Sequence, residues 1–419
     1  MSTSQEVTLG EVNVAPAEKA TCPGCGSHSV TTFYEVDRVP VHSVLLVRTN
    51  EEAVNFPLGD IKLGFCEACG FIYNQVFNPN LLNYSAEYEE TQGFSPTFNA
   101  FHKRLALDLI DRYDLHEKKV IEIGCGKGEF LTLLCQLGNN WGIGFDPAYV
   151  PARNVSDIKD RITFVEDFYS EAYAGHQGDF VCCKMTLEHI EKTAEFIGIV
   201  RRSVGDRSDA VIFFQIPNAT HILEDLVFWD VYYEHCSYFS KGSLARLFRS
   251  QGFDVLSLWT DYDNQYLMIE AKPSLGTPRP ALEDEESPAE LKGKVQAYAD
   301  RIQEKLAAWR SALKALNTAG RRVVLWGGGS KAVAFLTTLG IGGEVACAVD
   351  INPFKHGTYL AKTGHEIVGP EYLKEYKPDV VIVMNPVYHN EIKRDLAKMG
   401  LTPTLLNADA NQVDILGAA

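Results

Sequence analysis

The chain has 419 residues, of which 46% are hydrophobic and 22% are charged, and its formal net charge is −16. This composition is that of a globular protein and excludes disorder of the whole chain, and the length predicts about three domains. The acidic balance disfavours nucleic acid as a partner, because binding a polyanion needs clustered lysine and arginine. The sequence has no run of about 18 apolar residues, and residues 1–20 lack the basic and apolar regions of a signal peptide. We therefore expect a cytoplasmic protein without a membrane span.

Four of the ten cysteines form two matched pairs, Cys22-x-x-Cys25 and Cys66-x-x-Cys69, each followed by glycine. One tight turn directs both thiolates of a pair at the same ion, and two such turns complete a tetrahedral zinc site. A closed four-thiolate site has no open position, so we expect this zinc to be structural. The spacing disfavours the alternative of two unrelated buried pairs. The module at residues 21–80 should contain short strands, and an inserted hairpin could fill the gap between the pairs.

The middle of the chain alternates strands with helical segments, which predicts a doubly wound α/β sheet. A helix is expected from about residue 98 to 116, where apolar residues recur at helical spacing. A strand, glycine turn and helix follow at 118–138, and the predicted later strands and closing hairpin lie at 139–148, 162–169, 179–190, 210–218 and 253–273.

The glycine turn after the first of these strands is Glu122-x-Gly124-x-Gly126-x-Gly128. Glycines let the backbone approach a ligand closely and leave N–H groups free. An acid before the first glycine suits a ligand with an ammonium group. A dinucleotide site is disfavoured because the third glycine comes one residue too early for the G-x-G-x-x-G fingerprint.

Acids at the ends of the next two strands extend this candidate site. Asp146 is placed to accept hydrogen bonds from ribose hydroxyls, and Asp167 from an adenine amino group, with Phe168 beside the ring. The glycine turn together with these acids resembles a class I S-adenosylmethionine-dependent methyltransferase, which implies that cofactor.

A segment rich in proline and acids at 272–290 predicts a linker, and a long helix is expected from about 288 to 318. A second α/β domain follows, with its own glycine turn at Gly327–Gly329 before Lys331. Asp350 lies at the distance where an acid reads an NAD ribose, so an NAD site is a rival. The contiguous glycines and Lys331 favour a diphosphate instead.

The segment 232–240 is dense in groups that move protons. His235 has an ordinary pKa near 6.5 and can act as a base at neutral pH. Glu234 could orient it or hold a substrate hydroxyl, and Tyr232 could donate to a developing oxyanion. The alternative is an aromatic loop whose polar groups are merely satisfied.

The order of these parts resembles the sugar C-methyltransferases that act on nucleotide-linked 4-keto-deoxyhexoses, such as those of the tetronitrose and mycarose pathways. The course of the chain predicts a zinc-binding module at 1–80, a methyltransferase domain at 81–273 and a C-terminal α/β domain at 274–419. The resemblance implies residue roles. Tyr232, Glu234 and His235 line the substrate site, with His235 as the base. Tyr84 and Tyr88 close over the cofactor, and His189 is a second acid/base group or shapes the pocket. The nucleotide-sugar diphosphate meets Gly329 and Lys331, and Asn352 and Asn385 read its base or ribose.

The sequence thus predicts methylation of a carbon through a base-generated enolate. Lys184 stands where some relatives have another residue, which leaves the substrate contacts open. The remaining alternatives are an O- or N-methyltransferase, a keto substrate that is not a sugar, and a binding protein without catalysis. The intact Glu122, Asp146 and His235 disfavour the last of these.

Overall fold

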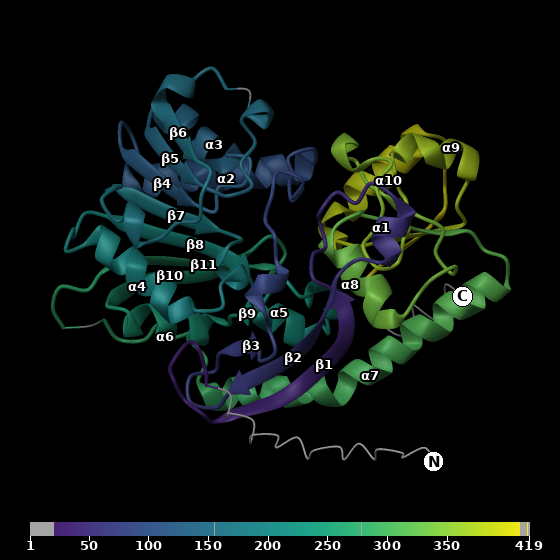
Figure 1. The fold of residues 1–419 in the computed structure, drawn as a ribbon, viewed down its shortest axis with the longest axis horizontal. Helices are drawn as coiled ribbons and strands as arrows, with labels where there is room; N and C mark the ends of the chain where they lie inside the picture. The colour runs from purple at the N-terminus through teal and green to yellow at the C-terminus, as the bar shows by residue number, and fades with distance from the viewer. Residues whose placement is uncertain (1–20, 155, 278, 411–416, 418–419) are drawn as a thin grey trace, which may run out of the picture.

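Three β-sheets organise the described part of the chain (Figure 1). The computed structural model describes residues 21–154, 156–277, 279–410 and 417. The expectation about a signal peptide concerns residues 1–20, which lie outside the described residues. Among the described helices, none combines the length and apolar character that crossing a membrane requires.

The N-terminal sheet has the strand order β1-β2-β3-β9 and is antiparallel. Its strands are β1 (Val30–Pro40), β2 (Leu58–Cys66), β3 (Ile72–Asn74) and β9 (Ser237–Tyr238), and the short helix α1 (Asn50–Val54) lies between β1 and β2. The β1–β2 hairpin fills the gap between the cysteine pairs, as expected. Its strands are longer than expected, and β9 comes from a distant part of the sequence.

The central sheet has the order β10-β11-β8-β7-β4-β5-β6, in which the five strands from β8 to β6 are parallel. All seven strands lie where the sequence predicts them: β4 (Lys119–Ile123), β5 (Trp141–Phe145), β6 (Ile162–Val165), β7 (Phe180–Lys184), β8 (Val211–Pro217), β10 (Phe253–Asp261) and β11 (Tyr266–Pro273). The associated helices are α2 (Pro96–Tyr113), α3 (Glu129–Gly138), α4 (Thr193–Val204), α5 (Ala219–Glu224) and α6 (Lys241–Ser250).

Helices cover both faces of this sheet. Side chains of α2 and α3 share one buried cluster with Val120 of β4, and those of α4 and α6 share another with Ile121 of the same strand. Because successive strand residues point to opposite faces, a strand buried on both sides is apolar at nearly every position. The predicted doubly wound fold is confirmed.

The C-terminal sheet is parallel, with the order β14-β13-β12-β15-β16. Its strands are β12 (Val323–Trp326), β13 (Ala348–Val349), β14 (Ile367–Val368), β15 (Val380–Val383) and β16 (Thr404–Asn407). Its helices are α8 (Ser330–Leu339), α9 (Leu373–Tyr376) and α10 (His389–Lys398). β14 and β16 have no counterpart among the strands that the sequence predicts.

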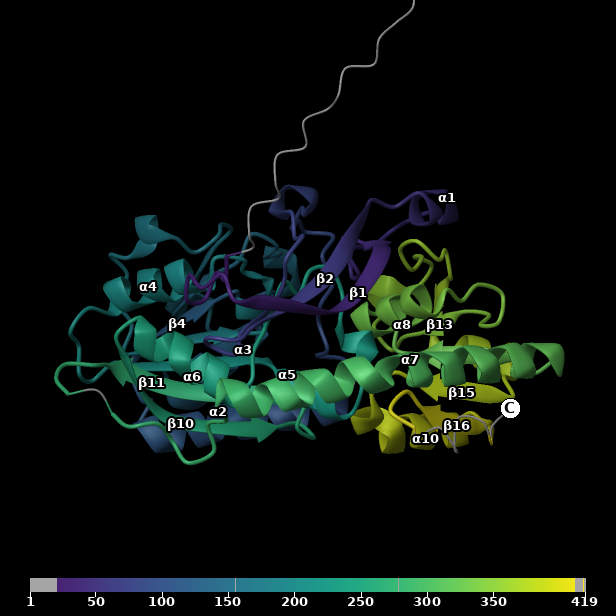
Figure 2. The ribbon, with the colours of Figure 1, turned by 90° about the horizontal axis from the view of Figure 1, so that it is seen from below.

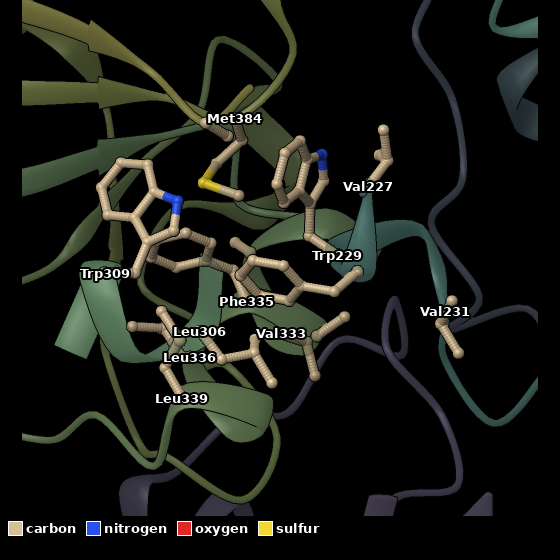
Figure 3. Close-up of a cluster of buried hydrophobic side chains, with 14 of the residues drawn as sticks. Val227, Trp229, Val231, Leu306, Trp309, Val333, Phe335, Leu336, Leu339 and Met384 are labelled. Carbon is tan, nitrogen blue, oxygen red and sulfur yellow. The ribbon is translucent and has the colours of Figure 1, made fainter. Parts of the chain in front are cut away.

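The long helix α7 (Pro288–Thr318) joins the parts; it runs along the lower side of the molecule in Figure 1 and crosses the middle of the view from below in Figure 2. A capping box of Ser287 and Glu290 starts it, which agrees with the predicted start near residue 288. Tyr298 packs edge-on against Tyr34 of β1, with ring centres 5.4 Å apart. Trp309 lies 5.0 Å from Phe335 of α8, within the buried cluster that Figure 3 shows. One apolar core thus extends from the N-terminal sheet to the C-terminal sheet.

The acidic residues of the predicted linker are paired with the central domain. Arg249 of α6 donates to both carboxylate oxygens of Glu285 at 2.6 Å, and Lys241 pairs with Asp284. These contacts tie the segment before α7 to the central domain. The division into 1–80, 81–273 and 274–419 stays a prediction, since β9 of the N-terminal sheet comes from the middle range.

Candidate active site

A cavity of about 630 Å³ lies between the carboxyl ends of the central strands and the C-terminal domain. Residues from both glycine turns and from the segment 232–240 line it. Of the predicted site residues, the lining includes Tyr84, Tyr88, Glu122, Gly124, Gly126, Asp146, Asp167, Phe168, His189, Tyr232, His235, Gly329, Lys331, Asn352 and Asn385. Gly128 and Glu234 do not line it.

The turn after β4 needs its glycines for shape. Gly124, Gly126 and Gly128 have φ of 68°, 54° and 78°, in the left-handed region that favours glycine. A Cβ on Gly124 would lie 2.0 Å from Oγ1 of Thr186. The Gly126 N–H donates to Oδ2 of Asp146 at 2.8 Å, and the Ala148 N–H donates to Oδ1 at 2.7 Å. The turn and the strand end therefore fix the Asp146 carboxylate, whose remaining lone pairs are available for a ligand.

Aromatic side chains stand over this end of the cavity. The rings of Tyr84 and Tyr88 lie 5.2 Å apart, and Phe168, which is 60% exposed, lies 6.2 Å from Tyr84. Asp167 accepts the Tyr173 hydroxyl at 2.6 Å. The predicted cofactor residues are thus gathered at one place, while their roles stay predictions.

Two histidines and two tyrosines form a chain of contacts deeper in the cavity. The Tyr232 hydroxyl lies 2.8 Å from Nε2 of His235, and the Tyr84 hydroxyl lies 3.0 Å from Nδ1 of His189. The two imidazole rings are 4.9 Å apart. Burial lowers the pKa of His235 well below its ordinary value, and the Lys331 charge adds to this. Burial also lowers the pKa of His189 to about 4. Both rings are therefore neutral at pH 7, the form in which imidazole accepts a proton.

Glu234 is placed differently from the prediction. Its carboxylate accepts the Ser43 N–H at 2.9 Å and the Ser43 hydroxyl, and its Oε1 lies 3.0 Å from Nδ1 of His42. His42 accepts the Asn83 N–H through Nε2 at 2.8 Å, so Nδ1 carries the proton that it donates to Glu234. Glu234 therefore contacts His42, not His235, because these donors already occupy its oxygens. Sequence reasoning missed His42, which carries no motif of its own.

Sequence reasoning also gave no role to Glu188. This carboxyl group is 1% exposed, neither oxygen has a hydrogen-bond partner among the described residues, and Oε1 lies 4.0 Å from Nε2 of His235. Burial raises the pKa of Glu188 to about 8, so the group is mostly protonated at pH 7.

Replacing Glu188 with glutamine is expected to flatten the pH dependence of stability. An unfolded glutamate has a pKa near 4.3, so between that pH and about 8 the folded state holds a proton that the unfolded state has released. Stability therefore falls as pH rises, and this one group accounts for a loss of about 1.5 kcal/mol between pH 6.5 and 8. Denaturant unfolding of the ligand-free protein at both pH values measures the loss. In E188Q the free energy of unfolding should fall by about 1.5 kcal/mol less between these pH values than in the wild type. The variant E191Q, at an exposed neighbouring position, should show the same fall as the wild type. An unchanged slope in E188Q would contradict the assignment.

The polar side chains at the second glycine turn already have protein partners. Lys331 pairs with Asp230, the Asn352 side-chain amide donates to Glu89 at 2.9 Å, and Asn385 accepts from Gln265 at 2.9 Å. A ligand bound at this turn would have to replace these hydrogen bonds and ion pairs or share the groups that form them.

The two glycine turns are built alike. Asp350 accepts the Gly328 N–H at 2.9 Å, just as Asp146 accepts the Gly126 N–H in the first turn. Asp350 therefore stands in the second turn where Asp146 stands in the first, and the NAD interpretation of the second turn remains an alternative.

The four cysteines converge at one end of the N-terminal sheet. Their ligand atoms all lie within 4.8 Å of one another, with Sγ–Sγ distances of 3.7 Å for Cys22 and Cys69 and 3.6 Å for Cys25 and Cys66. A tetrahedral zinc with bonds of about 2.3 Å holds its sulfurs about 3.8 Å apart. The donor set and its spacing therefore fit zinc.

Comparison with known proteins relates the chain to methyltransferases. A model described as a methyltransferase domain matches residues 98–258, and one described as a C-methyltransferase C-terminal domain matches residues 280–402. C-methyltransferase NovU of Streptomyces niveus is 27% identical over 310 residues, covering 70% of this chain and 72% of that protein. The chain is an S-adenosylmethionine-dependent methyltransferase, and its C-terminal region matches the C-methyltransferase model.

Other proteins resemble parts of this chain. A ubiquinone biosynthesis O-methyltransferase of Neisseria meningitidis serogroup C is 27% identical over 171 residues, covering 36% of this chain and 70% of that protein. The solved magnesium protoporphyrin IX methyltransferase of Synechocystis, with bound SAH, is 18% identical and has a TM-score of 0.34 over 42% of this chain and 84% of its own. An O-methyltransferase family protein from Burkholderia thailandensis, also 18% identical, has a TM-score of 0.34 over 46% of this chain and 64% of its own.

Proposed function

We propose that this C-methyltransferase methylates a carbon atom next to the ketone of a nucleotide-linked 4-keto-deoxy sugar, through an enolate. The observation that carries the proposal is the buried, neutral His235 beside Tyr232 in the cavity that the first glycine turn also lines. Its relative NovU carries the C-methyltransferase name, and the matched C-terminal model shares it. The sugar and its nucleotide are inferred from the sequence resemblance.

The cofactor site is assigned to residues around the first turn. In this proposal Asp146 accepts the ribose hydroxyls, Asp167 and Phe168 meet the adenine, and Glu122 faces the ammonium group. Tyr84 and Tyr88 close over the site. When bound, S-adenosylmethionine supplies an electrophilic methyl group on its sulfonium.

His235 removes the proton next to the ketone in this mechanism. Its Nδ1 is buried and has no hydrogen-bond partner among the described residues, while Nε2 contacts the Tyr232 hydroxyl. If Nε2–H donates to the Tyr232 oxygen, Nδ1 is the base and the phenol O–H remains free to donate to the enolate oxygen. Charge spread onto that oxygen makes the carbon nucleophilic, and fixed positioning of the reacting groups supplies much of the rate.

Glu234 acts in this proposal by positioning. It ties the segment 232–240 to His42 and Ser43, and the Ser43 hydroxyl, which donates to Glu234, can accept the Ser330 hydroxyl at the start of α8, 2.8 Å away. The carboxylate therefore fixes the base-bearing segment against the domain that would hold the nucleotide. His189 completes the wall beside His235.

Two further sites belong to the proposal. We assign structural zinc to Cys22, Cys25, Cys66 and Cys69. We assign the substrate diphosphate to Gly329 and Lys331, where phosphate would compete with Asp230 for the amine, and the nucleoside to Asn352 and Asn385.

Mass spectrometry of reactions with S-adenosylmethionine and a panel of nucleotide-linked 4-keto-deoxy sugars, in water and in D2O, tests the function. A gain of one methyl group with deuterium exchange at the adjacent carbon is the expected result. Methylation of a hydroxyl or amine without exchange would favour the O- or N-methyltransferase alternative. Demonstrated cofactor binding without transfer or exchange would place the substrate outside keto sugars.

A further inference from the structure

Lys184, the last residue of β7, is a buried amine in the cavity that lacks an opposite charge at contact distance. Its Nζ lies 2.8 Å from Nε2 of His102 on α2 and 3.9 Å from the ring centre of Phe130 on α3. Within the described part of the chain, it makes no ion pair within 4.0 Å and has no other hydrogen-bond partner. Burial lowers the pKa of His102 to about 2, and the Lys184 charge adds to this. His102 is therefore a neutral acceptor for one N–H of the ammonium, and two N–H groups stay available.

Glu122 is the complementary group on the adjacent strand. It is 2% exposed at the end of β4, and its Oε2 has no hydrogen-bond partner among the described residues. Burial raises the pKa of Glu122 to about 7, and the positive charge of Lys184 partly opposes this rise. Burial lowers the pKa of Lys184 to about 8, and the negative charge of Glu122 partly opposes this fall. Strands β4 and β7 are paired, with Ile123 opposite Cys183, so both groups lie at the same edge of the sheet. Two buried, unpaired groups of opposite sign are costly to maintain unless a ligand satisfies both.

The strand order gives the direction in which a ligand would lie. Asp146 ends β5, the glycine turn ends β4 and Lys184 ends β7, and these strands are consecutive in the sheet. Strands spaced about 4.8 Å apart place the two outer ends about 10 Å from each other. That is the scale of the chain of atoms from the ribose of S-adenosylmethionine to its α-carboxylate.

We propose that Lys184, oriented by His102, binds the α-carboxylate of S-adenosylmethionine, while Glu122 faces the α-ammonium. The inference deepens the proposed cofactor site and does not depend on the identity of the acceptor substrate. The cavity then selects a zwitterion: the cofactor brings one charge of each sign to groups that lack partners. Lys127 is a different kind of buried lysine, because its amine already donates to the carbonyl oxygens of Tyr88 and Ala148 at 2.9 Å and 2.8 Å.

Calorimetric titration with S-adenosylmethionine and with its decarboxylated analogue tests the proposal without any acceptor. A hydrogen bond to a charged group, lost on removal of one partner, corresponds to a change in affinity of about 10- to 100-fold. The wild type should bind S-adenosylmethionine more tightly than the analogue by about this factor. K184M should weaken binding of S-adenosylmethionine by the same factor and leave binding of the analogue unchanged, so that the variant no longer distinguishes the two ligands.

Three further variants complete the design. K184R, which keeps the cation, should retain discrimination between the two ligands, and H102L should lose part of it. K127M should weaken both ligands equally. Wild-type protein that binds the two ligands equally would overturn the proposal even if no variant folds. Equal weakening of both ligands in K184M would also overturn it. Because the assay contains no sugar, its outcome is separate from failure of the proposed substrate.

Discussion

Replacing His235 with alanine is expected to lower kcat for methyl transfer by about 1,000-fold, within the range of about 10²- to 10⁴-fold that general-base catalysis supplies. The enolate cannot form at a useful rate without a base at this position, because the ketone alone does not make the adjacent proton acidic enough at neutral pH. Affinity for S-adenosylmethionine should change little, since His235 contacts Tyr232 and His189 and lies apart from the glycine turn. The measurement is initial-rate kinetics together with the rate of deuterium uptake from D2O.

A matched control for this variant is H116A, since His116 is exposed in the loop after α2 and should have no effect on the rate. Added imidazole should restore part of the deuterium exchange in H235A, because the small base can occupy the space that the side chain leaves. Exchange in H235A at a rate near that of the wild type would show that another group removes the proton.

Loss of zinc is expected to be the most destabilising single change. Structural zinc contributes roughly 10–16 kcal/mol to folding in small peptides. The β1–β2 hairpin keeps its packing against α7 without the ion, so we expect C66S to lower the free energy of unfolding by about half of that range, on the order of 5 kcal/mol. Cys66 is fully buried in the cluster. Mass spectrometry of the native protein measures whether zinc is bound, and denaturant unfolding of C66S and the wild type measures the loss of stability.

The same variant should also lower catalysis. β3 begins three residues after Cys69 and pairs with β9, which begins two residues after His235. Disorder in the cysteine turns would therefore disturb the position of His235 through the pairing of β3 with β9. C135A is the control, because Cys135 is buried in α3 away from the cluster and should leave the metal content unchanged. Purified protein without zinc, or a C66S variant of unchanged stability, would contradict the assignment.

Much of the architecture could be predicted because its signals are local. A buried apolar strand followed by a glycine turn and a helix can be recognised within about 20 residues, as at β4 and β12. The two-residue spacing within each cysteine pair can be recognised in the same way. Asp146, the acid after β5, lines the cavity because the carboxyl ends of parallel strands meet at one edge of the sheet, and its role at a ribose stays a prediction.

The parts that could not be predicted depend on contacts between distant segments. His42 meets Glu234 across 192 positions, and Lys331 meets Asp230 across 101. The sequence singles out Glu234 but places it beside His235, and it gives Asp230 no role. Only the tertiary arrangement decides which basic group each acid contacts. β9 has two residues, too few for a periodic pattern, and it exists because the edge of β3 needs a partner.

The strand exchange at β9 limits how such enzymes can be recombined. A chimera joined at residue 80 would supply β3 from one parent and β9 from another, and a poor match would leave an open strand edge prone to aggregation. A chimera joined just before α7 would take this helix from the second parent. The helix packs against Tyr34 of the N-terminal sheet as well as against Phe335 of the C-terminal domain, so one of its two contacts would join different parents. Joining two enzymes at either of these positions would therefore disturb the fold as well as change the substrate preference. Grafting a new acceptor specificity therefore requires transplanting β1, β9 and α7 together with the C-terminal sheet, or redesigning side chains within the cavity itself.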